Sequence, residues 1–128
     1  MMAEAIINRK GSPIRAIFAG IRSNDTLKSI SFPELIGAKN AVITLVKQRY
    51  SQSEYRPISS IVIEDGKVTH VTVASSSASL YSESPSVVEF YPNWGIITIE
   101  DDTYSFPINY NPINDSFQSP SDYFCVVY

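Results

Sequence analysis

The sequence predicts an all-β fold, an antiparallel β-sandwich or Greek-key barrel with an N-terminal arm. Short runs of alternating apolar and polar residues recur along the chain, and clusters of Gly, Pro, Asn, Asp and Ser separate them. Eight tyrosines and a shortage of strong helix formers suit pleated, half-buried strands. No segment keeps a 3.6-residue apolar rhythm over the length of a helix.

The bulk composition indicates one folded domain. The chain has 128 residues, 44% hydrophobic and 18% charged, which is enough apolar material for a core and too little charge for disorder. We expect residues 1–13 to form an arm that ends at a Gly-Ser-Pro break. Residues 14–128 then form a single β domain.

The first half of this domain should supply two strands, a turn and a long strand. Residues 14–21 and 26–32 are the two strands. Residues 33–37 read as one helical turn, because Gly37 is a natural stop after two apolar residues. Residues 40–50 form the clearest strand, and apolar residues on both sides of it predict a middle that is buried on both faces.

Two hairpins are predicted further along the chain. Asp65-Gly66 separates residues 58–64 from residues 67–75, and Gly accepts the positive φ that a type I′ turn demands. A second two-residue turn, Asp101-Asp102, separates two further strands. The remaining segments follow in order: a serine-rich loop over 75–86, strands over 87–91, 96–100 and 103–108, an irregular loop over 109–121 and a terminal strand over 123–128.

The net charge of −3 conceals an uneven distribution along the chain. The first 67 residues carry all ten basic residues and six acidic ones, hence +4, whereas the rest carries seven acidic residues, hence −7. Two faces of opposite sign would suit head-to-tail or partner assembly. The alternative is that folding mixes the two halves. With a pI near 5.0, the chain lacks the basic footprint of a nucleic-acid binder.

The sequence contains few features that indicate a cellular compartment. A single cysteine permits no intrachain disulfide, and the first eleven residues lack the apolar core of a signal peptide. No apolar run reaches the roughly 18 residues of a membrane span. We therefore expect synthesis in a cytoplasm and no membrane-spanning segment.

The residues that carry chemistry form no recognisable catalytic or metal-binding set. His70 should lie on the wetter face of its strand, and Cys125, between two apolar residues, should be a buried, inert thiol. One Cys and one His cannot supply a zinc site. Residues 100–102 could offer oxygens to calcium, but they lack EF-hand spacing and are typical of solvated turns. We expect no cofactor and no enzymatic activity.

Aromatic residues concentrate between positions 90 and 110. Trp94 falls at a loop tip, where it either caps the core or forms an exposed platform for a sugar or a partner's side chain. The residues predicted for such ligand or partner contact are Tyr91, Trp94, Tyr104 and Tyr110.

Residues 3–11, Ala-Glu-Ala-Ile-Ile-Asn-Arg-Lys-Gly, resemble the start of tail-associated and fibre-type virion proteins from phages of Gram-positive, often gut, bacteria. Residues 32–37 and the strand after them also look like a phrase from the β-rich domains of those proteins. The resemblance implies a virion structural protein, made in the host cytoplasm, that is a tail or fibre accessory or a capsid decoration. No family active site comes with it.

Assembly is thus the expected mode of action. The apolar residues of the arm would be exposed to water if the arm were free, and docking on a neighbour would bury them. The predicted assembly residues are Ala3, Ala5, Ile6, Ile7 and Arg9. The expected partners are other virion proteins and further copies of the chain, with a host surface glycan as another candidate. The alternative function is a stand-alone carbohydrate-binding, lectin-like β module, and a small enzyme ranks third.

Overall fold

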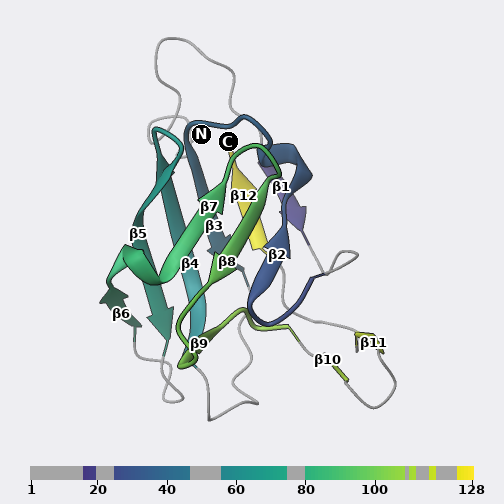
Figure 1. Ribbon diagram of the computed structural model, residues 1–128, viewed down its shortest axis with the longest axis vertical. Helices are drawn as coiled ribbons and strands as arrows, with labels where there is room; N and C mark the ends of the chain where they lie inside the picture. Colours follow the sequence, from purple (N-terminus) through teal and green to yellow (C-terminus); the bar gives the residue numbers. More distant parts are fainter. Residues whose placement is uncertain are drawn as a thin grey trace.

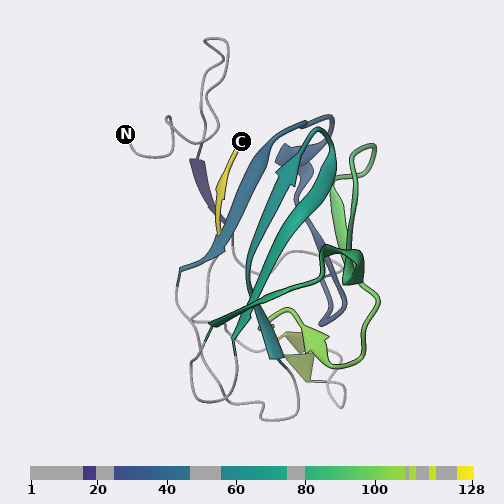
Figure 2. The same ribbon diagram turned by 90° about the vertical axis from the view of Figure 1, so that its left-hand side faces the viewer.

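Two antiparallel sheets pack face to face in the computed structural model, which describes residues 16–19, 25–46, 56–74, 80–108, 110–111, 116–117 and 124–128. Figures 1 and 2 show the smaller sheet lying across one face of the larger one. The larger sheet has the order β1 (Ala16–Ala19), β12 (Phe124–Val127), β3 (Ala41–Leu45), β4 (Arg56–Glu64), β5 (Lys67–Ala74) and β6 (Leu80–Glu83). The smaller sheet has the order β2 (Ser29–Ser31), β8 (Ile96–Ile99) and β7 (Val88–Tyr91). The predicted all-β sandwich is confirmed.

The core lies between the two sheets and follows the period of the strands. On β3, Ala41, Ile43 and Leu45 are buried, whereas Thr44 is exposed, as is Val46 directly after the strand. The prediction that the middle of this strand is buried on both faces is therefore wrong. No described element covers the outer face of the larger sheet, so only one face of β3 is packed.

Three phenylalanines join separate parts of the chain inside the core. The ring of Phe124 meets Phe32 and Phe106 edge-on, with centroid distances of 6.0 and 6.1 Å. Edge-to-face pairs of this kind stabilise a core beyond the area they bury. The terminal strand predicted over 123–128 is thus confirmed as β12, and it lies inside the larger sheet between β1 and β3.

The first predicted hairpin is confirmed. Strands β4 and β5 pair across Asp65 and Gly66, whose φ angles of 52° and 77° are both positive, as a type I′ turn requires. The pairing contains two irregularities. Val62 faces His70 while Ile63 faces Val68, so Thr69 is an extra residue on β5. Such a bulge changes the direction in which the neighbouring side chains project.

The second predicted hairpin is wrong. Strand β8 already has β2 on one side and β7 on the other, so neither edge is open to the next segment. The chain instead turns away, and β9 (Tyr104–Ser105) pairs in parallel with the start of β4. The ammonium group of Lys28 holds this turn by donating to the carbonyl oxygens of Asp101 and Tyr104. The hairpin that does form is β7–β8, through residues 92–95.

The serine-rich segment predicted as a loop contains structure. Its residues 80–83 form β6, which pairs with the end of β5, and η2 (Pro85–Val87) follows. The hydroxyl of Ser84 caps this turn by accepting from the Ser86 N–H, at 3.4 Å. This strand forms because its backbone pairs with β5. Its residues do not alternate between apolar and polar, so the sequence alone did not reveal it.

The remaining predictions differ from the structure mainly in length. Strands β1 and β2 are shorter than expected, and the turn at 33–37 is confirmed as η1 (Pro33–Leu35), with Gly37 at a φ of 77°. The loop predicted over 109–121 contains β10 (Tyr110–Asn111) paired with β11 (Ser116–Phe117). The predicted arm, residues 1–13, lies outside the described residues. Across the described ranges, no helix is long and apolar enough to cross a membrane.

The positive and negative halves of the sequence interleave in the described strands. Strand β12, from the acidic half, lies between β1 and β3, from the basic half. Strand β2 likewise pairs with β8. Folding therefore mixes the two halves within both sheets and does not give each half a sheet of its own.

Candidate functional site

Three turns meet at one end of the sandwich, at the top of Figure 1. The Gly37 N–H donates to the Pro92 carbonyl oxygen at 2.9 Å, and the Phe32 N–H donates to that of Gly95 at 2.7 Å. These two bonds fasten the β7–β8 turn to the segment around η1. The β4–β5 turn joins them through a 2.8 Å bond from the Gly66 N–H to the Lys39 carbonyl oxygen. The end of the sandwich is consequently braced by backbone bonds between distant parts of the chain.

Gly95 makes the closest of these approaches possible. Its φ is 64°, and a Cβ at this position would lie 2.3 Å from the carbonyl oxygen of Phe32 and 3.1 Å from Cγ1 of Ile36. No side chain larger than hydrogen fits there without moving the backbone. This glycine therefore allows the β7–β8 turn to lie directly against η1.

The braced turns present two large apolar side chains to solvent. Trp94 is 70% exposed and Ile36 is 57% exposed, whereas Phe32 and Leu35, in the segment around η1, are 0% exposed and belong to the core. We call Ile36 and Trp94 the apolar tip. Because Trp94 itself is 70% exposed, the alternative in which it caps the core is wrong, and its side chain is open to solvent.

The other predicted contact residues have different fates. Tyr91 begins the same turn, is 39% exposed, and donates its hydroxyl to Glu89 Oε2 at 2.8 Å. Tyr104 is buried and donates to Glu83 Oε2 at 2.9 Å, so its predicted role in contact is wrong. The parallel pairing of β9 with β4 places it in the core. The side chain of Tyr110 and the predicted assembly residues Ala3, Ala5, Ile6, Ile7 and Arg9 lie outside the described residues.

Ile36 is a surface residue that the sequence analysis does not single out. The signal at 33–37 predicts the turn, but it does not say which of the two apolar residues before Gly37 faces solvent. The structure shows that η1 is a single 3₁₀ turn, in which only Leu35 is buried. An apolar residue directly before a left-handed glycine was the available clue.

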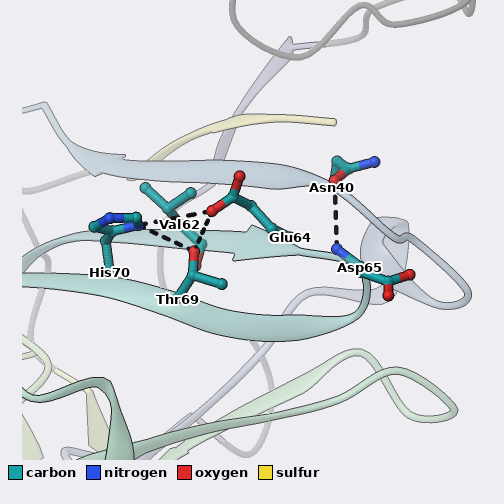
Figure 3. Close-up of polar contacts among 6 residues, drawn as sticks. All are labelled: Asn40, Val62, Glu64, Asp65, Thr69 and His70. Carbon is teal, nitrogen blue, oxygen red and sulfur yellow. Dashed lines mark hydrogen bonds and ion pairs between the residues drawn. The ribbon is translucent and has the colours of Figure 1, made fainter.

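A polar cluster occupies the outer face of the β4–β5 hairpin (Figure 3). Thr69 Oγ1 lies 2.6 Å from Glu64 Oε1 and 3.0 Å from His70 Nδ1, and the last two atoms are 3.8 Å apart. The short bond to the carboxylate uses the hydroxyl hydrogen of Thr69. Nδ1 of His70 is therefore the donor toward Thr69. The bulge at Thr69 brings this hydroxyl beside the imidazole, which spacing along the sequence did not reveal.

The geometry of this cluster does not match an activated nucleophile. For His70 to act as a base toward Thr69, its nitrogen would have to accept the hydroxyl hydrogen, which goes to Glu64 instead. The His70 side chain is 71% exposed, which confirms its prediction on the wetter face. A second bond in Figure 3, from the Asp65 N–H to Asn40 Oδ1 at 3.4 Å, supports the hairpin turn. The cluster is a surface hydrogen-bond network.

Acidic groups lie together on the outer face of the smaller sheet. A side-chain hydrogen bond with Glu89, and then repulsion by its charge, raises the pKa of Glu100 above its ordinary value of 4.5. The hydrogen bond to Glu89 also raises the pKa of Tyr91. By contrast, the Thr103 hydroxyl and N–H both donate to Asp101 and lower the pKa of that carboxyl. Within the described part of the chain, no three His, Cys, Asp or Glu side chains are grouped to hold a metal ion.

Cys125 is half-buried, so the prediction of a buried thiol is wrong. The inward-facing residues of β12 are its neighbours Phe124 and Val126. Alternation along the strand therefore places Cys125 on the outer face of the larger sheet.

Comparison with known proteins found no counterpart for this arrangement. No protein-family model matches the sequence, and neither a curated protein nor a solved structure matches the chain.

Proposed function

We propose that the protein is a structural component of a phage particle, a tail or fibre accessory or a capsid decoration, and that it acts by protein–protein assembly. The resemblance of residues 3–11 to the start of phage tail and fibre proteins supports this role. The apolar tip is the observation that supports assembly with other proteins. Trp94 is 70% exposed although its turn is held in place by backbone hydrogen bonds.

An exposed tryptophan on a fixed turn is suited to binding. A Trp side chain can bury roughly 150–250 Å², and Trp is enriched among the residues that dominate interface energies. Because the turn is already braced on both sides, a partner would pay little conformational entropy to order it. The tip therefore offers a preformed contact surface in which Ile36 extends the area around Trp94.

The described residues also favour binding over catalysis. The one His lies in a network whose hydrogen bond runs from the imidazole to the hydroxyl and on to the carboxylate. We propose that this network stabilises the hairpin surface and that the protein is not an enzyme.

Incorporation into particles tests the proposed role. Phage particles purified on a density gradient should contain the chain by mass spectrometry. Copies that carry Trp94→Ser should be incorporated about tenfold less, as expected for loss of an interface hot spot. His70→Ala is the matched control, because it removes another exposed ring from a different face. Absence of the chain from purified particles would refute the virion role.

Carbohydrate binding is the second candidate, because Tyr91 and Trp94 lie on one turn and exposed aromatic faces stack on sugars. Trp94 is the single tryptophan of the chain, so its fluorescence reports on this turn directly. Titration with host cell-wall polysaccharide should shift the emission to the blue if a glycan covers the ring. An unchanged spectrum, with normal incorporation into particles, would favour the protein–protein role.

A further inference from the structure

Strand β6 forms one edge of the larger sheet and exposes apolar side chains there. No described strand pairs with its outer side. Leu80 is 63% exposed and Tyr81 is 47% exposed, although they are adjacent and project to opposite faces of the sheet. An edge strand with exposed apolar residues is a template for pairing with another chain.

An added strand would satisfy β6 in two ways. Residues along an antiparallel strand direct their backbone groups alternately to the two sides, so about half of the residues of β6 present an N–H and a C=O outward. A strand laid along this edge would also cover Leu80 and Tyr81, one on each face. The shallow groove of about 520 Å³ beside Leu80 contains no charged residue, and its lining includes Thr44, Ser60 and Thr72. The exposed Leu80 and Tyr81 favour a short strand with apolar side chains as the occupant of the edge, and no charged group of the groove opposes it.

The first residues of the chain have the matching composition. Ala3, Ala5 and Ile7 occupy every second position, as the residues on one face of a strand do, and Ile6 adds a further apolar side chain. This segment is about as long as β6. Residues 1–12 contain Arg9 and Lys10 against one acidic residue, whereas the charged residue of β6 is Glu83. Opposite charges favour the encounter of these two segments.

The topology favours a second copy over the same chain as the source of this strand. The described part of the chain begins at β1, which is the opposite edge of the same sheet from β6. Five strand spacings of about 4.8 Å separate the two edges by about 24 Å. Between copies placed side by side, the β1 edge of one meets the β6 edge of the next. Eight residues, 8–15, connect Ile7 to Ala16 and span about 26 Å at full extension. Reaching the β6 edge of the same chain would need this linker to be almost fully extended across the sheet, whereas the edge of an adjacent copy lies well within its reach.

We propose that residues 3–7 of one copy add as a strand to the β6 edge of a second copy. The inference rests on the assembly role proposed above. Donor and acceptor are different surfaces, so the contact is head-to-tail and produces a ring or a filament, depending on whether the rotation between copies closes.

Two variants separate the donor from the acceptor. Deleting residues 1–12 removes the donor, and Leu80→Lys places a charge on the acceptor edge at an exposed position that folding does not use. In sedimentation velocity, each variant alone should self-associate about tenfold or more weakly than the full chain. Mixed together, they should form one-to-one dimers, because the Leu80→Lys chain keeps its arm and the shortened chain keeps its edge.

A control separates this inference from the apolar tip. Ile36→Lys changes a residue of similar exposure beside the braced turns, whereas Leu80 pairs with Ala74 at the far end of the β4–β5 hairpin. This variant should leave self-association unchanged while it weakens incorporation into particles. Three outcomes would overturn the inference. The full chain could remain monomeric up to about 100 µM, well above weak specific affinities. The mixed variants could fail to form the dimer, which would point to symmetric edge pairing. Finally, the shortened chain could melt many degrees lower, which would show that the arm completes its own sheet.

Discussion

Replacing Gly95 with alanine tests whether the β7–β8 turn depends on its contact with η1. The left-handed φ of 64° costs a non-glycine residue about 1–2 kcal/mol. The new Cβ would also lie 2.3 Å from the Phe32 carbonyl oxygen, so the backbone must move and weaken the bond from the Phe32 N–H to Gly95. Loss of such a hydrogen bond costs about a further 0.5–1.5 kcal/mol. The expected destabilisation is therefore about 1.5–3.5 kcal/mol.

Gly37 provides a matched control for this substitution. Its φ of 77° is similarly left-handed, but nothing lies within 4 Å of the position that a Cβ would take. Gly37→Ala should therefore incur only the conformational cost of about 1–2 kcal/mol. The difference between the two variants isolates the close approach of the two turns.

Urea unfolding followed by far-UV circular dichroism measures both free energies. At roughly 4 °C per kcal/mol for a chain of this size, Gly95→Ala should also lower Tm by about 6–14 °C. The emission of Trp94, the adjacent residue, reports whether the turn itself shifts in the folded state. Equal destabilisation by the two variants, or a loss below about 0.5 kcal/mol for Gly95→Ala, would refute the argument that this glycine is required by contact.

The other predictions concern charged groups. Lys28→Met removes the donor to the carbonyl oxygens of Asp101 and Tyr104. The free energy of unfolding in urea should fall by about 1–3 kcal/mol. An unchanged midpoint would show that the turn between β8 and β9 is stable without this side chain. Glu89→Gln should change the pH dependence of stability. Glu89 raises the pKa of Glu100 in the folded state. The stability of the folded state is therefore unaffected by this pair below the ordinary pKa of 4.5, and it decreases as the pH rises through the raised pKa. The Gln variant should lose this decline in melting scans from acid to neutral pH, and a parallel profile would contradict the assignment.

Local signals predicted the elements whose geometry is set by a few consecutive residues. Asp65-Gly66 predicted a hairpin because the type I′ turn needs positive φ at both positions, and both angles are observed. The helical turn at 33–37 was similarly readable from its terminal glycine. Alternation correctly puts Ala41, Ile43 and Leu45 on one face of β3, because side chains of a strand project alternately to its two sides. The valines on the other face led to the wrong prediction that both faces are buried.

The candidate site was only partly predictable, since exposure depends on what packs over a residue. The sequence places Trp94 at a loop tip, but only the structure shows that it is 70% exposed and does not fold back onto the core. Tyr104 is among the predicted contact residues because it belongs to the aromatic concentration between positions 90 and 110, in a segment that was expected to pair with β8 as a hairpin. It is buried because β8 had no free edge for that hairpin.

The amino-acid sequence by itself determined the β class, the position of the confirmed turn and which side chains of a strand share a face, because backbone sterics and side-chain alternation act over a few residues. The tertiary structure decided which strands pair. It placed β12 between β1 and β3, paired β9 with β4, and inserted Thr69 as a bulge beside Glu64 and His70. Strand pairing depends on which edges remain open once the other strands have met, and that competition is settled only when the whole chain packs.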